Sequence, residues 1–227
     1  MQRLLSKVSI HVNESIYLKD PESSDLGKRI IAGGIDLIDR IGFEQFTFRK
    51  LAREINSTEA SIYRYFDSKH KLLLYLTAWH WGWMEYRLVF SVANIKSPTE
   101  RLEIAIRILT ERIVEDHSFS HINNLKLYQI VISESSKAYL TKEVDHENKE
   151  GFFSGYKQIV ERVSDIILEI EPDFKYPHML ISTVIEGAHH QRFFAEHLPR
   201  LTDVIKGEDA VTSFCRDMVF STLNKRA

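Results

Sequence analysis

A cluster of hydrogen-bond donors lies in the first third of this 227-residue sequence, within about one and a half turns of a predicted helix. Its members are Ser61, Tyr63, Arg64 and Tyr65. Hydroxyl and guanidinium groups bind phosphates and read the edges of base pairs. A surface helix whose tyrosines pack on neighbouring residues has the same composition. The cluster therefore indicates either nucleic-acid contact or surface packing.

A histidine pair late in the chain is the best candidate for a metal site. Glu186 and His190 are four residues apart on a predicted helix, which is a spacing that metal ligands use, and His189 lies between them. A third ligand would have to come from elsewhere, such as His117 or His121. Helical histidines more often line a pocket or a core. We therefore predict no metal, and assign His189 and His190 to a ligand pocket.

Signatures of common enzyme classes are absent from the sequence. It contains no G-x-G-x-x-G, no Gly-Lys loop for phosphates and no G-x-S-x-G. Cys215 is the single cysteine, which excludes an intrachain disulfide framework and a thiolate zinc site. We therefore predict a protein that is not an enzyme and has no cofactor.

The donor cluster is positioned by the stretch from Thr47 to Lys69, which predicts two short helices around a tight turn. Thr47 caps the first helix, and Asn56 follows it as a residue that tolerates left-handed backbone. Thr58 caps the second helix, predicted over residues 59–66. The apolar residues of the first helix have helical spacing: Phe48, Leu51, Ala52 and Ile55. The stretch predicts a helix-turn-helix, whose second helix would enter a DNA major groove.

A longer helix is predicted before this motif, over residues 26–41, and Gly42 ends it. Gly33 and Gly34 weaken its middle but permit close contact with another helix. Residues 1–25 alternate between apolar and polar types, which favours a short hairpin or an extended arm, with a disordered tail as the alternative. Such an arm would touch the DNA minor groove through Arg3 or Lys7, or pack on its own domain.

Residues 31–76 resemble the DNA-binding domain of TetR-family transcriptional regulators. The resemblance follows the order and spacing of Gly42-Phe43, Thr47, Leu51-Ala52, Ser61-Ile62-Tyr63, Tyr65-Phe66, Ser68-Lys69 and Leu72-Leu73. It implies phosphate contacts from Thr47, Tyr63, Tyr65 and Lys69. It further implies a recognition helix that opens with Thr58, Glu59, Ala60 and Ser61, with Arg49 and Arg64 nearby. Glu59 and Ser57 depart from the residues that are usual in the family.

The resemblance also implies a ligand-binding body after the DNA-binding domain. Helical spacing predicts further helices at about 69–92, 98–114, 126–140, 150–169, 177–197 and 208–223. Trp83, Tyr86 and Tyr128 are candidates to line the ligand pocket, with core packing as the alternative. The helices at 150–169 and 177–197 carry wide apolar faces, which predict either an intrachain core or a dimer interface. The interface candidates are Phe152, Tyr156, Ile159, Val163, Leu180, Val184, Gly187 and Ala188.

Charge and composition limit the possible partners. The formal net charge is −2, and residues 1–70 carry 11 Lys/Arg and 10 Asp/Glu, so DNA affinity must come from local placement of charge. Neither a signal peptide nor an apolar run of membrane length is present, so we predict a cytoplasmic protein without a membrane partner.

We predict an all-α protein with three parts: an arm or hairpin at 1–25, a three-helix DNA-binding domain at 26–71, and a larger helical domain for ligand binding and dimerisation at 72–227. By the resemblance it is a homodimeric repressor on near-palindromic double-stranded DNA, released by a small-molecule effector. The alternative is a related fold that has lost specific DNA binding and serves as a helical ligand carrier or enzyme.

Overall fold

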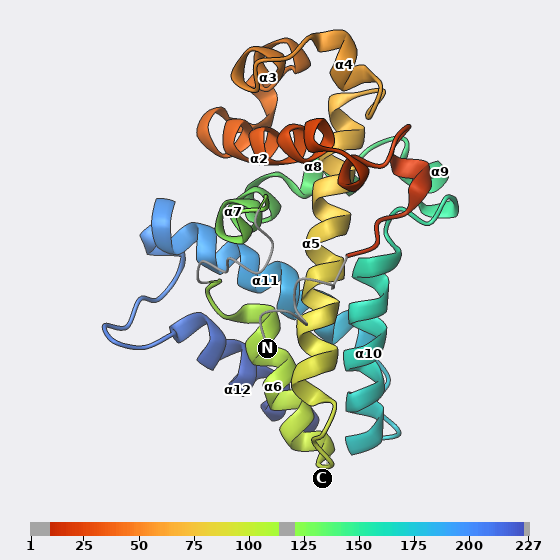
Figure 1. Ribbon diagram of the computed structural model, residues 1–227. Helices are drawn as coiled ribbons and strands as arrows, with labels where there is room; N and C mark the ends of the chain where they lie inside the picture. The colour runs from red at the N-terminus through yellow and green to blue at the C-terminus, as the bar shows by residue number, and fades with distance from the viewer. Residues whose placement is uncertain (1–9, 114–120, 225–227) are drawn as a thin grey trace. The chain divides into compact units, whose positions relative to one another are not determined.

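The computed structural model describes residues 10–113 and 121–224, and no strand occurs among them (Figure 1). The prediction of an all-α fold is confirmed. The chain divides into two compact units. The first unit consists of Met1–Gly82 and Ile113–Ser154, and the second of Trp83–Arg112 and Gly155–Ala227. Within the described residues, no helix is long and apolar enough to cross a membrane.

The first unit contains the predicted helix-turn-helix. Its elements in chain order are η1 (Glu14–Ile16), η2 (Pro21–Ser23), α2 (Asp25–Gln45), α3 (Phe48–Glu54), α4 (Glu59–Tyr63), the first part of α5 (Lys69–Val92), α7 (Asn124–Glu134), α8 (Ser136–Tyr139) and α9 (Val144–Lys149). Helices α2, α3 and α4 gather at one end of α5 in Figure 1. Their shared core includes the fully buried side chains of Phe46, Leu51, Ile62 and Phe66.

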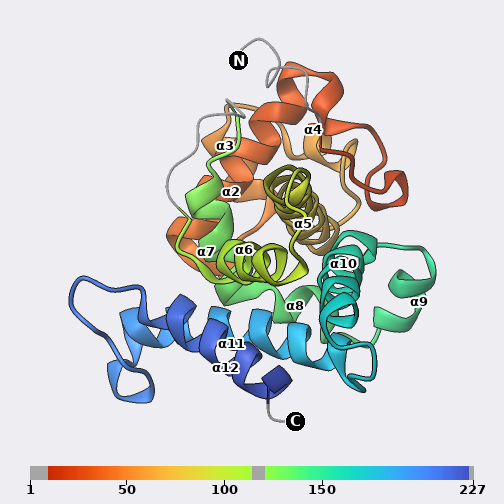
Figure 2. The same ribbon diagram turned by 90° about the horizontal axis from the view of Figure 1, so that it is seen from below.

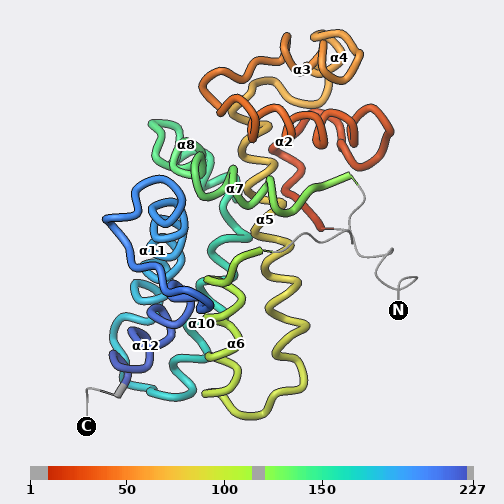
Figure 3. Tube along the Cα trace, turned by 90° about the vertical axis from the view of Figure 1, so that its left-hand side faces the viewer, coloured from red at the N-terminus to blue at the C-terminus, as the bar shows by residue number. Residues whose placement is uncertain are grey.

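Helix α2 is interrupted where the sequence predicts its end. Gly42 has φ 74° and ψ 157°, so residues 43–45 form a separate short turn. Earlier in α2, a Cβ on Gly33 would come within 2.4 Å of Ile55 Cγ2, which confirms that this glycine permits a close approach of α3. Helix α7 packs along α2, as Figure 3 shows. An ion pair of 2.6 Å between Lys126 and Asp36 joins these two helices.

The described part of the N-terminal segment is not a hairpin. Residues 10–24 form the two short 3-10 turns η1 and η2, while residues 1–9, including Arg3 and Lys7, lie outside the described residues. The segment packs on its own unit, because Val12 and Ile16 are buried and the Leu18 amide donates to the Tyr65 carbonyl at 2.8 Å. The apolar alternation is explained by this burial rather than by strand pairing.

The second unit contains the end of α5, α6 (Pro98–Thr110), α10 (Ser154–Ile170), α11 (Pro177–His197), η3 (Pro199–Leu201) and α12 (Ala210–Asn224). Helices α11 and α12 run side by side, and both contact α6 (Figure 2). Buried Arg192 joins all three, since its Nε donates to the Thr110 carbonyl at 3.1 Å and its Nη2 to Asp209 at 2.8 Å. Burial opposes ionisation of Asp209, but hydrogen bonds from Arg192 and Thr212 outweigh it and lower the Asp209 pKa.

Several predicted boundaries differ from the structure. The helix predicted at 126–140 is divided into α7 and α8, and the helix predicted at 98–114 ends at Thr110. The charged stretch around residues 142–149 contains helix α9, whose Glu147 is buried and contacts His70 at 2.8 Å. Cys215 lies in α12 at 2% exposure, and burial raises the pKa of its thiol to about 11.

Candidate nucleic-acid interface

The turn between α3 and α4 is closed by backbone hydrogen bonds. Asn56 has φ 55°, so the predicted left-handed residue is present. The Ser57 amide donates to the Ala52 carbonyl at 2.8 Å, and the Asn56 amide donates to the Arg53 carbonyl at 3.3 Å. This pair of bonds is the Schellman motif, which satisfies the last carbonyls of a helix. Ser57 contributes only its backbone, so its unusual side chain does not alter the turn.

We expect Asn56→Val to lower the free energy of unfolding by about 1–2 kcal/mol, because a β-branched side chain clashes in left-handed backbone. Asn56→Gly is the matched control, since glycine adopts this conformation freely and should retain wild-type stability. Urea denaturation followed by circular dichroism measures both variants. Equal stability of the two variants would contradict the conformational explanation.

Both helices of the motif begin with the predicted threonine caps. Thr47 accepts a hydrogen bond from the Lys50 amide, and Thr58 accepts one from the Ser61 amide, each at 3.2 Å. The Thr58 and Ser61 hydroxyls are also hydrogen-bonded to each other at 2.8 Å. These bonds satisfy amides that have no partner inside the helix and fix the start of α4. Both hydroxyls are therefore held at the end of α4 that would face base edges.

The exposed side chains of α3 and α4 form a surface of donors. Arg49, Ala60, Tyr63 and Arg64 are exposed, while Glu59 and Ser61 are half-buried. The Tyr63 ring packs edge-on against Phe48 at 5.0 Å between centroids, which orients its hydroxyl outwards at 48% exposure. Within the described residues, the side chains of Arg49 and Arg64 make no hydrogen bond or ion pair. Their guanidinium groups are available to an anion.

Arg53 is a further member of this surface that the motif comparison missed. It is exposed on α3, and its guanidinium is likewise unengaged among the described residues. The signal was its position four residues after Arg49, which places both on one helix face. Lys50, also exposed, instead donates to the Gln45 carbonyl at 2.7 Å.

Two of the predicted phosphate contacts are engaged inside the protein. Tyr65 is 3% exposed, and its hydroxyl is hydrogen-bonded to the Ser24 hydroxyl at 2.7 Å. Lys69 donates to the carbonyls of Phe43, Glu44 and Phe46 at 3.1–3.3 Å. The predicted role of Tyr65 is wrong for this structure, because α4 ends at Tyr63 and the next turn directs Tyr65 inwards. Lys69 has three ammonium protons and three carbonyl acceptors, so we leave it out of the proposed phosphate contacts.

Comparison with known proteins agrees with this geometry. The model of the family described as "Bacterial regulatory proteins, tetR family" matches residues 30–76. This part of the chain is therefore a TetR-family DNA-binding domain. The protein is a DNA-binding transcriptional regulator with a helix-turn-helix. No curated protein sequence matches the chain.

Solved structures similar to this chain share its fold at low sequence identity. The complex of AibR with isovaleryl coenzyme A and operator DNA has a TM-score of 0.56 at 15% identity, covering 86% of this chain and 97% of that one. FadR from Bacillus subtilis in complex with stearoyl-CoA has a TM-score of 0.58 at 16% identity, covering 86% and 96%. A regulator from Saccharomonospora viridis in complex with choline has a TM-score of 0.58 at 16% identity, covering 89% and 98%.

The predicted pocket residues differ in their burial and in the unit to which they belong. Trp83, Tyr128 and His189 are buried, and Tyr86 is half-buried against Phe90. Tyr128 belongs to the first unit and the other candidates to the second. His190 is exposed and stacks on the Phe194 ring, so its role in a ligand pocket stays a prediction.

The histidine pair has no third ligand among the described residues, where no group of three or more His, Cys, Asp or Glu side chains could hold a metal ion. Glu186 instead accepts a hydrogen bond from the Tyr156 hydroxyl at 2.8 Å. Burial lowers the pKa of His189 to about 4; the Glu186 carboxylate opposes this effect and His190 adds to it. His189 is therefore neutral at pH 7.

Most predicted dimer-interface residues are buried within the single chain. The most buried are Phe152, Ile159, Val163, Val184 and Ala188, each at 4% exposure or less. These five residues form intrachain core, which favours the alternative of core packing for them over a dimer interface. Leu180, Tyr156 and Gly187 are half-buried. A Cβ on Gly187 would meet no heavy atom within 4 Å, so this glycine faces open space.

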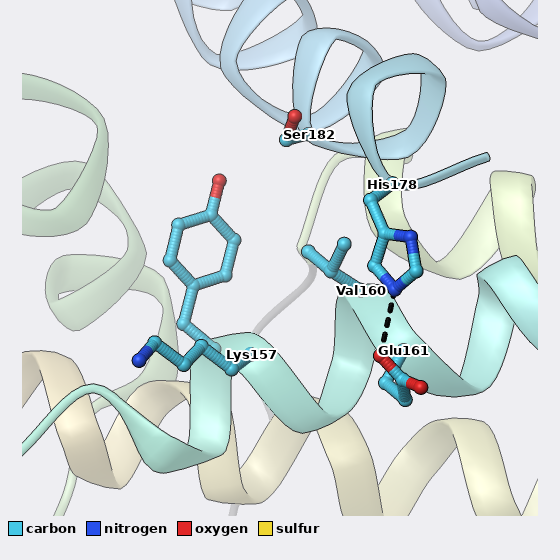
Figure 4. A pocket seen from close by; sticks show the side chains of 6 residues that line it. Lys157, Val160, Glu161, His178 and Ser182 are labelled. Carbon is cyan, nitrogen blue, oxygen red and sulfur yellow. Dashed lines mark hydrogen bonds and ion pairs between the residues drawn. The ribbon is translucent and has the colours of Figure 1, made fainter. Parts of the chain in front are cut away.

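A groove of about 310 Å³ lies between α10 and α11 in the second unit. Its lining residues are Tyr156, Lys157, Val160, Glu161, His178 and Ser182. In Figure 4, Val160 and Glu161 of α10 lie beside His178 of α11, and His178 Nε2 is 2.7 Å from a Glu161 oxygen. The exposed face of these two helices therefore includes a mainly apolar concavity with a histidine–carboxylate hydrogen bond at its edge.

Proposed function

We propose that this TetR-family regulator is a homodimeric repressor that a small-molecule effector releases from a near-palindromic operator. The observation that carries the DNA-contact part is the exposed surface of α3 and α4. It presents Arg49, Arg53, Tyr63 and Arg64, and no internal hydrogen bond or ion pair among the described residues engages the three arginines. Arginine and tyrosine in this arrangement fit phosphates, while Ala60 and Ser61 lie at the start of α4, where base edges come closest.

A direct test is a gel-shift titration against the DNA upstream of the protein's own gene, with unrelated DNA of equal length as control. We expect specific retention that weakens steeply with salt, because each neutralised phosphate adds about 0.9 to the slope of log K against log salt. A folded, dimeric protein without a specific shift at low salt would favour the alternative, a related fold that has lost DNA binding. Half-buried Glu59 is the residue that would support this alternative, since its carboxylate repels phosphate.

We expect Tyr63→Phe to weaken binding to operator and to unrelated DNA about tenfold per head, and so about a hundredfold for the dimer, because each lost hydrogen bond to a charged acceptor contributes roughly 1.5 kcal/mol. Tyr176→Phe is the matched control, as Tyr176 is an exposed tyrosine outside the helix-turn-helix. Fluorescence anisotropy at several salt concentrations measures both. An unchanged affinity for Tyr63→Phe would remove this hydroxyl from the phosphate contacts.

The proposed dimer uses the outer face of α11 together with α10. Met179, Thr183, Gly187 and His190 follow one another at helical spacing on α11, and Met179 is 66% exposed. The glycine and threonine permit close packing of a second helix, and the groove between α10 and α11 supplies a concave apolar surface. A twofold dimer would present two recognition helices to half-sites roughly 34–36 Å apart.

The effector acts, in this proposal, by binding the DNA-incompetent arrangement more tightly than the competent one. Similar structures hold isovaleryl coenzyme A, stearoyl-CoA or choline, so they do not favour one chemical class. We assign effector binding and dimerisation to residues 72–227 and DNA binding to residues 26–71. A thermal-shift screen that includes acyl-CoA thioesters and quaternary amines identifies ligands, and anisotropy then shows which of them release DNA.

A further inference from the structure

The turn that leads into the helix-turn-helix is held from two sides. Gly42 ends the regular part of α2, so the Phe43 amide begins a new turn and the Phe46 amide closes it onto the Phe43 carbonyl at 3.2 Å. The next residue, Thr47, caps α3. The position of residues 43–46 therefore sets where the first helix of the DNA-binding motif starts.

The amide end of this turn is held by a carboxylate from α7. Glu134 Oε1 accepts a buried hydrogen bond from the Phe43 amide at 3.0 Å, and the Glu134 residue is only 8% exposed. Its second oxygen contacts Lys137 Nζ at 2.7 Å, and the same ammonium contacts Glu44 at 3.1 Å. The hydrogen bond with Glu134 raises the pKa of Lys137, which keeps the lysine charged. The buried carboxylate is thus paired as well as hydrogen-bonded.

The carbonyl end of the turn is held by an ammonium from α5. Lys69 is the first residue of α5, and its Nζ donates to the carbonyls of Phe43, Glu44 and Phe46. The ammonium also lies 4.7 Å from the centroid of the Phe43 ring. Unpaired amides at the start of a helical turn attract an anion, and carbonyls at its end attract a cation. The Glu134 carboxylate at the amide end and the Lys69 ammonium at the carbonyl end therefore both stabilise the turn.

We propose that Glu134 and Lys69 form an electrostatic clamp on residues 43–46, through which α7 and α5 position the helix-turn-helix for DNA. Both are positioning residues, and neither touches DNA in this arrangement. The inference rests on the proposed DNA contacts of α3 and α4. It assigns a function to Glu134, a buried acid outside the helix-turn-helix motif. It also replaces the predicted phosphate contact of Lys69 by contacts inside the protein. In this proposal, a shift of α7 relative to α5 loosens one side of the clamp.

The test combines hydrogen–deuterium exchange of the DNA-free protein with operator titrations. In Glu134→Ala, we expect faster exchange in peptides covering residues 42–48 and about tenfold weaker operator binding, since a buried amide loses its charged acceptor. In Glu134→Gln, an acceptor oxygen remains, so both effects should be smaller; this variant also carries the test if the alanine variant does not fold. Lys126→Ala is the matched control, because Lys126 joins α7 to α2 without touching the turn.

Lys69→Gln separates the two roles of this lysine. A clamp residue gives faster exchange at residues 42–48 without DNA, whereas a phosphate contact leaves exchange unchanged and lowers the salt slope by about one per head. The clamp is overturned if Glu134→Ala retains wild-type exchange and affinity, or if Lys126→Ala reproduces its effects. A wild-type protein that binds no DNA overturns the proposed function and the DNA part of this proposal, while the exchange data still decide the clamp.

Discussion

Gly187→Leu should leave the fold intact and weaken operator binding at least about a hundredfold, because two linked heads gain roughly 10²–10⁴ in affinity over one. Gly187 lies on the outer face of α11, and a Cβ there meets no atom of its own chain within 4 Å. The position therefore has room for a Cβ in the monomer, and replacing the glycine improves helix propensity by about 0.8 kcal/mol. In the proposed dimer, the same side chain occupies space that the second copy needs.

Sedimentation velocity measures the dimer dissociation constant, and anisotropy measures operator affinity. Ser221→Leu is the matched control, because Ser221 is an exposed helical residue on α12 and receives the same apolar side chain. We expect this control to remain dimeric with wild-type affinity. A Gly187→Leu variant that dimerises as tightly as wild type would exclude the outer face of α11 from the interface.

Acidification should destabilise the second unit through His189 by about 3 kcal/mol, since its pKa is about 4 in the fold and about 6.5 when unfolded. The unfolded state then binds more protons than the folded state between these values. Above about pH 6.5, His189 is neutral in both states and does not reduce the free energy of unfolding. The reduction grows as the pH falls and reaches its full value below about pH 4. Glu186 moderates the effect, because its carboxylate favours the protonated ring.

Urea denaturation at intervals from pH 7.5 to 4 isolates this contribution when wild type is compared with His189→Gln, which cannot be protonated. We expect the stability difference between the two proteins to change by about 3 kcal/mol across this range, with wild type losing more on acidification. His190→Gln is the matched control, because His190 is the exposed neighbour on the same helix. Parallel curves for wild type and His189→Gln would contradict neutral burial of His189.

Local signals in the sequence were sufficient to predict the helix-turn-helix. The threonine caps, the left-handed Asn56 and the break at Gly42 all depend on short-range backbone requirements, and the structure has each of them. The inward turn of Tyr65 could not be predicted in the same way. It depends on α4 ending at Tyr63 and on a hydroxyl partner, Ser24, that is 41 residues away in the sequence.

Periodicity also could not tell which apolar faces are covered by the same chain. Val163 and Val184 have the spacing of an interface and are fully buried within one copy, whereas Gly187 faces open space. Glu134 gave no sequence signal, because its partner is a backbone amide 91 residues earlier. Tyr65 and Glu134 were therefore missed because their partners are distant in the chain, whereas Arg53 had a local signal in its spacing from Arg49.

The single cysteine makes the protein convenient for spectroscopic distance measurement. Cys215 is buried and its thiol has a pKa of about 11, so almost no reactive thiolate exists at pH 7. A cysteine introduced at exposed Lys28 on α2 can therefore be spin-labelled selectively in an otherwise natural background. Pulsed electron–electron double resonance between the two spin labels of a dimer would then measure the distance between the heads in solution, with and without a bound effector.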